Sequence, residues 1–70
     1  MHSVYTHNGH VIDVYVWPSE TRRASEHDVR RGFELVHWAD GAMQVWTVSD
    51  LERGELERFA QAWQERAAAR

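Results

Sequence analysis

The chain of 70 residues contains no cysteine, no lysine and a single proline. Without cysteine it can form neither disulfides nor thiolate metal sites. No apolar run approaches the roughly 18 residues of a membrane-spanning helix, so we expect no membrane contact by this segment. A chain this short buries only about 60% of its unfolded surface. We therefore expect residues 1–70 to form one small domain that gains stability from a partner.

The composition also argues against two broad classes of function. The net charge is −3, from 8 basic and 11 acidic residues, whereas nucleic-acid binding requires a basic surface. No set of residues has the spacing of a catalytic site, and Ser49 and Asp50 are better explained as helix caps. The sequence therefore predicts neither a nucleic-acid-binding protein nor an enzyme, and no cofactor.

Residues 3–17 predict a β-hairpin rich in Val, Ile, Tyr and Trp. Asn8-Gly9 lies between its two strands and is the favoured pair for a two-residue type I′ turn, in which both residues have positive φ. This turn sets the pairs His7–His10, Tyr5–Ile12 and Ser3–Val14. Pro18 has no N–H to donate to a sheet and therefore ends the second strand.

A second hairpin is predicted for residues 33–48, with Asp40-Gly41 as its turn. That turn sets the pairs Trp38–Met43, Val36–Val45, Leu35–Trp46 and Phe33–Val48. In both hairpins the side chains alternate between the two faces of the predicted sheet.

The segment between the hairpins, residues 19–32, is polar and is predicted to be a connection without a strand. Ser25, with Asp28 three residues later, favours the start of a short helical turn. Gly32 would end that turn.

The last part of the chain, residues 51–68, predicts a helix. Ser49 and Asp50 are suitable caps, and Glu52 lies three residues after Ser49, as in a capping box. One apolar stripe follows the helical period: Leu56, Phe59, Ala60, Trp63 and Ala67. Together these elements predict an α+β fold, in which a four-stranded antiparallel sheet of two hairpins carries the C-terminal helix on one face.

Strand alternation puts large apolar side chains on both faces of this sheet. One helix covers only one face, and monomers rarely leave a large apolar area uncovered. We therefore predict that the second face binds another copy of the chain, as a homodimer, or a segment outside this sequence. The residues predicted to form this interaction surface are Val36, Trp38, Met43, Val45, Tyr15 and Trp17.

An alternative hypothesis is a small ligand- or metal-sensing domain that uses surface histidines and aromatic residues. His7 and His10 face each other across the tight turn, with Cβ atoms about 5 Å apart, and two imidazoles can share a metal ion. A solvated turn explains the same two residues without a metal, so no metal is assigned. His37 is expected to be half-buried and bonded to Gln44 or to the main chain.

Three segments, "HVIDVYVWP", "RGFELVHWADGAMQVWTVSDL" and "ELERFAQAW", resemble the C-terminal part of the extracytoplasmic domain of bacterial transmembrane anti-sigma factors. The resemblance spans residues 9–63, and the order, spacing and Trp positions together make it specific. The matching positions are His10, Val11, Ile12, Val16, Trp17, Pro18, Gly32, Phe33, His37, Trp38, Gly41, Met43, Trp46, Val48, Ser49, Asp50, Leu51, Glu55, Leu56, Phe59 and Ala60. The chain departs from the pattern at Phe33, where Tyr is common, and at Glu52, where Asn is common.

This resemblance implies a fragment of a larger protein. Members of the family have a cytoplasmic domain that binds a sigma factor, one membrane-spanning helix and an extracytoplasmic domain. The chain is similar only to the last of these, so it would lie in the periplasm as part of an inner-membrane protein. The resemblance implies a signal-side regulatory interaction module whose partner is its own upstream domain or another copy. It would act on the sigma factor only indirectly, through the missing cytoplasmic domain.

Overall fold

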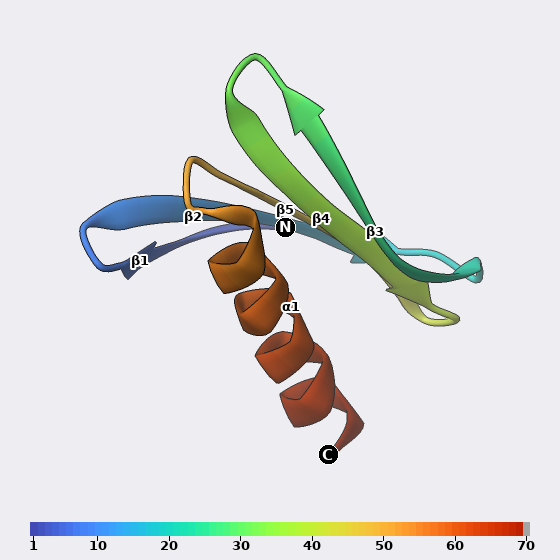
Figure 1. The fold of residues 1–70 in the computed structure, drawn as a ribbon. Coiled ribbons are helices and arrows are strands. Elements are labelled where there is room, and N and C mark those ends of the chain that lie inside the picture. The colour runs from blue at the N-terminus through green and yellow to red at the C-terminus, as the bar shows by residue number, and fades with distance from the viewer. Residues whose placement is uncertain (70) are drawn as a thin grey trace.

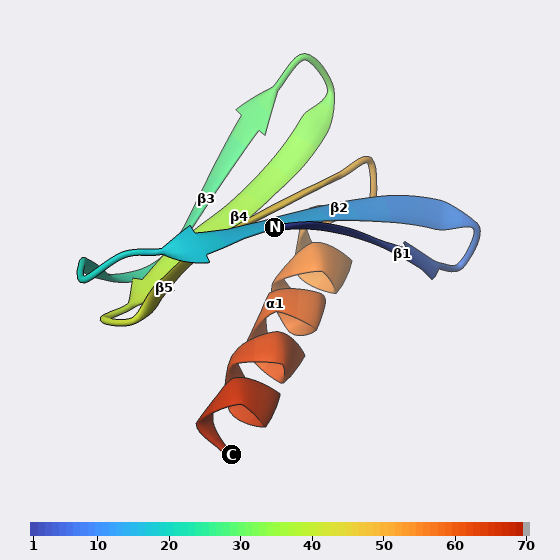
Figure 2. The same cartoon turned by 180° about the vertical axis from the view of Figure 1, so that it is seen from behind.

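The computed structural model describes residues 1–69 as a five-stranded antiparallel sheet with one C-terminal helix, an α+β fold (Figure 1). The strands are β1 (His2–His7), β2 (His10–Pro18), β3 (Arg22–Arg30), β4 (Phe33–Asp40) and β5 (Met43–Ser49), and the helix is α1 (Arg53–Ala68). Their order across the sheet is β1-β2-β5-β4-β3. Figures 1 and 2 show the β1–β2 and β3–β4 hairpins diverging on either side of β5, so the sheet is strongly twisted.

The first hairpin forms as the sequence predicts. Asn8 and Gly9 occupy its turn with φ of 51° and 80°, the positive values that a type I′ turn requires. The predicted pairs are all present: His7–His10, Tyr5–Ile12 and Ser3–Val14. Pro18 is the last residue of β2, as expected from its missing N–H.

The prediction of a polar connection between the hairpins is wrong, because Arg22–Arg30 form the edge strand β3. The turn from β3 to β4 is made by Arg31 and Gly32, whose φ values of 52° and 82° suit a type I′ turn. Arg is costly in this conformation, so the sequence shows no ordinary turn signal here. Charged side chains are tolerated on an edge strand. The sheet therefore has five strands rather than four, and Ser25 and Asp28 start no helical turn.

The second hairpin forms with a register two residues away from the predicted one. The observed pairs include Trp38–Val45, Val36–Thr47 and Leu35–Val48. The Asp40 carboxylate accepts hydrogen bonds from the main-chain N–H groups of Ala42 and Met43, at 2.9 and 2.8 Å, and Gly41 has a φ of 93°. These bonds from Asp40 stabilise a turn at residues 41 and 42, one residue later than the predicted turn at Asp40-Gly41. A shift of two residues leaves every side chain on its predicted face.

The hydrophobic core lies between α1 and one face of the sheet. Its buried residues are Ile12, Val14, Val16, Val36, Trp38, Val45, Leu51, Leu56 and Ala60, and Met43, Phe59 and Trp63 pack against them. Four of the five residues in the predicted apolar stripe of the helix thus contribute to this core. Thr47 is also buried here, and its hydroxyl donates to the main-chain carbonyl of Val36 at 2.7 Å. The hydroxyl of Thr47 is therefore satisfied.

The helix α1 begins at Arg53, two residues later than predicted, and Glu52 is its N-cap. The predicted caps instead fix the connection from β5 to α1. The hydroxyl of Ser49 donates to a main-chain carbonyl of β2 and accepts an N–H from two residues later. Asp50 bonds the imidazole of His10 at 2.8 Å. For residues 1–69, no helix combines the length and hydropathy needed to cross a membrane.

Candidate interaction surface

The face of the sheet opposite α1 carries a row of aromatic side chains across four strands. His2 on β1 lies opposite Tyr15 on β2, Tyr15 lies opposite Trp46 on β5, and Trp46 lies opposite His37 on β4. The rings of His2 and Tyr15 stack with centroids 4.5 Å apart, and those of His37 and Trp46 stack at 3.9 Å. The row is continuous because directly paired residues of antiparallel strands share one face. These four residues are called the aromatic row below.

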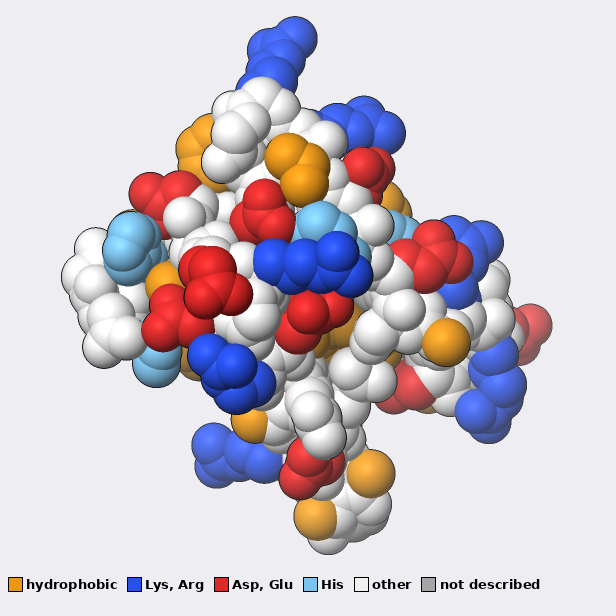
Figure 3. Space-filling view, viewed as in Figure 1, with side chains coloured by type: hydrophobic (Ala, Val, Ile, Leu, Met, Phe, Trp, Pro, Cys, Tyr) orange, Lys and Arg blue, Asp and Glu red, His pale blue; other side chains and the backbone are white. Residues whose placement is uncertain are grey.

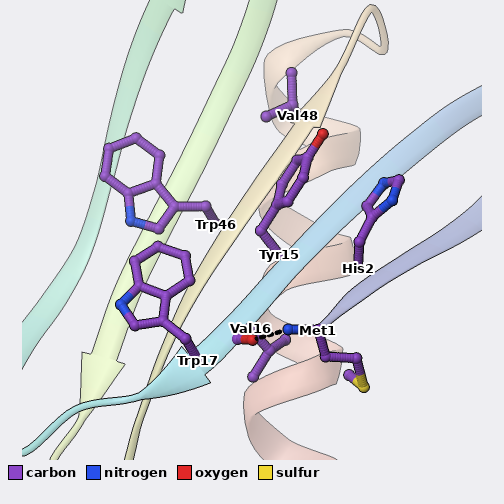
Figure 4. A pocket seen from close by; sticks show the side chains of 7 residues that line it. All are labelled: Met1, His2, Tyr15, Val16, Trp17, Trp46 and Val48. Carbon is purple, nitrogen blue, oxygen red and sulfur yellow. Dashed lines mark hydrogen bonds between the residues drawn. The ribbon is translucent and has the colours of Figure 1, made fainter.

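A shallow groove of about 490 Å³ runs along part of the aromatic row (Figure 4). Its lining residues are Met1, His2, Tyr15, Val16, Trp17, Trp46 and Val48. Figure 4 shows the Trp17 ring beside the Trp46 ring, with Tyr15 between Trp46 and His2. The imidazole of His2 is hydrogen-bonded to Asp13 Oδ1 at 2.9 Å. The groove is therefore mainly apolar and aromatic, and the imidazole of His2 at its side is already hydrogen-bonded.

Much of this face remains exposed to solvent. Tyr15 and Trp17 keep 41% and 40% of their surface accessible, and Val4, Val11 and Phe33 on the same face are also exposed. Alternation places all five on the side of the sheet away from α1. Of these five residues, Tyr15 and Trp17 lie together in the groove, and exposed apolar side chains gathered in this way mark interaction sites on soluble proteins.

Two polar atoms in the aromatic row are buried without a hydrogen-bond partner among residues 1–69: Nδ1 of His37 and Nε1 of Trp46. His37 is buried rather than half-buried. It stacks on Trp46, and its Nδ1 bonds neither Gln44 nor the main chain, the two expected partners. An unsatisfied buried polar group costs about 1–3 kcal/mol. The second face is thus less completely satisfied than the core beneath α1, where the Thr47 hydroxyl is bonded.

The six residues predicted to form the interaction surface lie on opposite faces of the sheet. Tyr15 and Trp17 line the groove. The other four are in or against the core beneath α1: Val36, Trp38, Met43 and Val45. The prediction is wrong for these four, because the pairing of β2 with β5 puts Tyr15 beside Trp46. No local turn sets the register of that pairing, although the preference of aromatic residues for cross-strand pairs could have indicated it.

The two histidines considered as metal ligands face each other as predicted but bond elsewhere. His10 Nδ1 lies 2.8 Å from Asp50 Oδ1, and His7 Nε2 lies 3.3 Å from the amide of Asn8. Within the part of the chain that the structure describes, no three His, Cys, Asp or Glu side chains gather as a metal site. His10 begins β2 and His7 pairs with it from the end of β1, and neither lines the groove, so these histidines and the aromatic groove do not form one site.

Charges of both signs are interspersed on the surface seen in the orientation of Figure 1, with small apolar patches between them (Figure 3). No stripe of basic side chains gathers on that surface, which is the feature that nucleic-acid binding requires. No family model, no curated protein and no solved structure matches the chain. The function is therefore inferred from the sequence and from the geometry of the exposed sheet face.

Proposed function

We propose that this chain is a regulatory interaction module that binds a protein partner through the aromatic row and its groove. The observation that carries the proposal is the exposed aromatic surface on the sheet face that α1 leaves uncovered. Trp and Tyr are enriched among the few desolvated interface residues that carry most of the binding energy. Trp17 and Tyr15 are exposed to solvent and stand next to the partly buried ring of Trp46.

In this proposal the parent protein is a transmembrane anti-sigma factor, and the chain is the C-terminal part of its extracytoplasmic domain. The resemblance over residues 9–63 supports this assignment, and its matching positions include Trp17 and Trp46 in the groove as well as Trp38 and Leu56 in the core. The chain then works in the periplasm, on the signal side of the inner membrane. It influences the sigma factor only through the cytoplasmic domain of the parent.

The partner proposed for the groove is the upstream part of the same extracytoplasmic domain. Such a partner would bury the exposed rings and complete the second face, as α1 does for the first. A signal that changes this packing would expose the groove again. That exposure would mark the parent protein for the next step of signalling.

Titration of the ¹⁵N-labelled chain with the separately expressed upstream segment tests the proposal. The indole N–H signals of Trp17 and Trp46 should shift, and Tyr15→Ser should weaken binding at least about tenfold. Tyr5→Ser is the matched control, because Tyr5 is also 41% exposed but lies on the face that carries α1. The affinity of the Tyr5→Ser variant for the upstream segment should stay unchanged. Equal losses in both variants, or no binding by the wild-type chain, would contradict the proposal.

A further inference from the structure

The sheet has two outer edges, β1 and β3, and the edge of β3 is protected against further strand pairing. Five of its nine residues are charged, and its pairing with β4 shifts register between Arg23 and Glu26. The carboxylate of Asp28 accepts the main-chain N–H of Val29 at 2.8 Å. Charges, a bulge and an occupied N–H are ways in which natural sheets prevent edge-to-edge association.

The edge of β1 has none of these features. Its sequence, HSVYTH, contains no Asp, Glu or Arg, and it pairs with β2 without a shift in register. Val4 and Tyr5 are 57% and 41% exposed. A regular, uncharged and partly apolar edge strand is a template for the addition of another strand.

Hydrogen bonds at the start of β1 determine which of its main-chain groups point outward. Met1 and Val16 exchange two main-chain hydrogen bonds, at 2.6 and 2.8 Å. Along an antiparallel strand, the main-chain N–H and C=O groups of successive residues point alternately toward the paired strand and away from it. Those of Met1 point toward β2, so those of the other odd-numbered residues of β1 do as well. The N–H and C=O groups of His2, Val4 and Thr6 therefore point away from the sheet.

We propose that this edge pairs with the same edge of a second copy, antiparallel, about a twofold axis at Val4. In that register Val4 lies opposite its own counterpart, and His2 lies opposite Thr6 of the other copy. The outward N–H and C=O groups of all three residues then meet, and paired side chains fall on the same face, as antiparallel pairing requires. Since β1 carries no Asp, Glu or Arg, the twofold axis brings no such like charges together.

Apolar side chains beside this edge add to the contact. On the helix face, the Tyr5 ring lies 5.6 Å from that of Phe59 and 5.7 Å from that of Trp63, as measured between centroids. These three residues line an open groove next to β1. On the other face Val4 stands exposed. Pairing of β1 with β1 joins two five-stranded sheets. It also covers the apolar side chains beside the edge on both faces of the sheet.

The contact is small beside the roughly 1,600 Å² of a standard protein interface, so we expect reversible, concentration-dependent dimerisation. It uses the main-chain groups of the sheet edge, and His2 is the one residue of the aromatic row that lies on this edge. The inference therefore goes beyond the proposed function. A dimer of this kind and a partner on the aromatic row can coexist.

Sedimentation velocity over a concentration series measures this association. Val4→Lys should raise the dimer dissociation constant at least about tenfold, because the twofold axis brings two ammonium groups together. Val29→Lys is the matched control: Val29 is 52% exposed on the β3 edge, and its substitution should leave dimerisation unchanged. Circular dichroism checks that both variants fold.

A single-cysteine variant provides a second measurement, since the chain has no other cysteine. Cα atoms in a hydrogen-bonded antiparallel pair are about 5.5 Å apart, a distance that a disulfide spans. Val4→Cys should therefore oxidise to a disulfide-linked dimer at least about tenfold faster than Val29→Cys. A strictly monomeric chain overturns the proposal, as does a dimer that Val4→Lys leaves intact. Either result leaves binding at Tyr15 untouched, so the two proposals fail separately.

Discussion

Asp40 closes the turn between β4 and β5, and its titration behaviour follows from that role. The main-chain N–H of Met43, and next that of Ala42, donates to the carboxylate and lowers the pKa of Asp40 below its ordinary value of 3.8. Arg22 adds a smaller effect in the same direction, while desolvation opposes it. The carboxylate is therefore stabilised in its ionised form by the fold.

The sign of the pH dependence follows from the lowered pKa. Ionised Asp40 stabilises the fold above pH 3.8, and this contribution is lost as the pH falls through the lower pKa of the folded state. We expect the Asp40 carboxyl carbon to titrate below pH 3.8 by NMR. Asp40→Asn should reduce the dependence of the unfolding free energy on pH in this acid range. A midpoint at or above the ordinary value would contradict the role assigned to the two N–H donors.

Single residues also show where the sequence is informative. Asn8-Gly9 is a strong turn signal because both residues tolerate positive φ, and the turn is where it predicts. Arg31 adopts a φ of 52° against its own preference, so the β3–β4 turn could not be recognised. In the latter case the pairing of the whole strand β3 outweighs an unfavourable local conformation.

At the scale of the elements, the two type I′ turns offer a reciprocal experiment. Arg31→Asn should stabilise the β3–β4 hairpin by about 0.5–1 kcal/mol, because Asn accepts positive φ more readily than Arg. Asn8→Arg should destabilise the first hairpin by a similar amount for the same reason. Unfolding in urea, followed by Trp fluorescence, measures both changes. Changes of the same sign in the two variants would be inconsistent with turn conformation as the cause.

The element that sequence patterns did not reveal is β3. Its nine residues contain one large aliphatic side chain, Val29, so they lack the alternation that identifies a half-buried strand. They form a strand because β4 offers an unpaired row of main-chain groups. The hydrogen bond between the His27 imidazole and the Glu34 carboxylate, at 2.6 Å and largely shielded from solvent, adds a side-chain link between the two strands. These contacts depend on a neighbour, not on the composition of β3.

At the scale of the whole molecule, stability rests on one thin core between α1 and the sheet. A domain of this length is stable by about 0.05–0.15 kcal/mol per residue. Leu56 is completely buried at the centre of that core, and Leu→Ala changes at such sites cost about 2–5 kcal/mol. Leu56→Ala should therefore unfold a large share of the isolated chain.

The exposed helix position Gln61 provides the control for this prediction. Gln61→Ala should change the unfolding free energy by no more than about 0.5 kcal/mol. Urea denaturation of both variants beside the unmodified chain makes the comparison. Comparable losses in the two variants would show that the core does not depend on Leu56 as described.

The sequence by itself determined the first hairpin, the position of α1 and the division of side chains between the faces of each hairpin. These features follow from interactions between residues close in the chain: turn chemistry at Asn8-Gly9, and periods of two and 3.6 residues. Only the tertiary structure decided that β2 pairs with β5 with Tyr15 beside Trp46, and that β3 joins the sheet. Those pairings sum many weak contacts between distant segments, so no local pattern records them. They also decide which apolar face α1 covers and which is left for a partner.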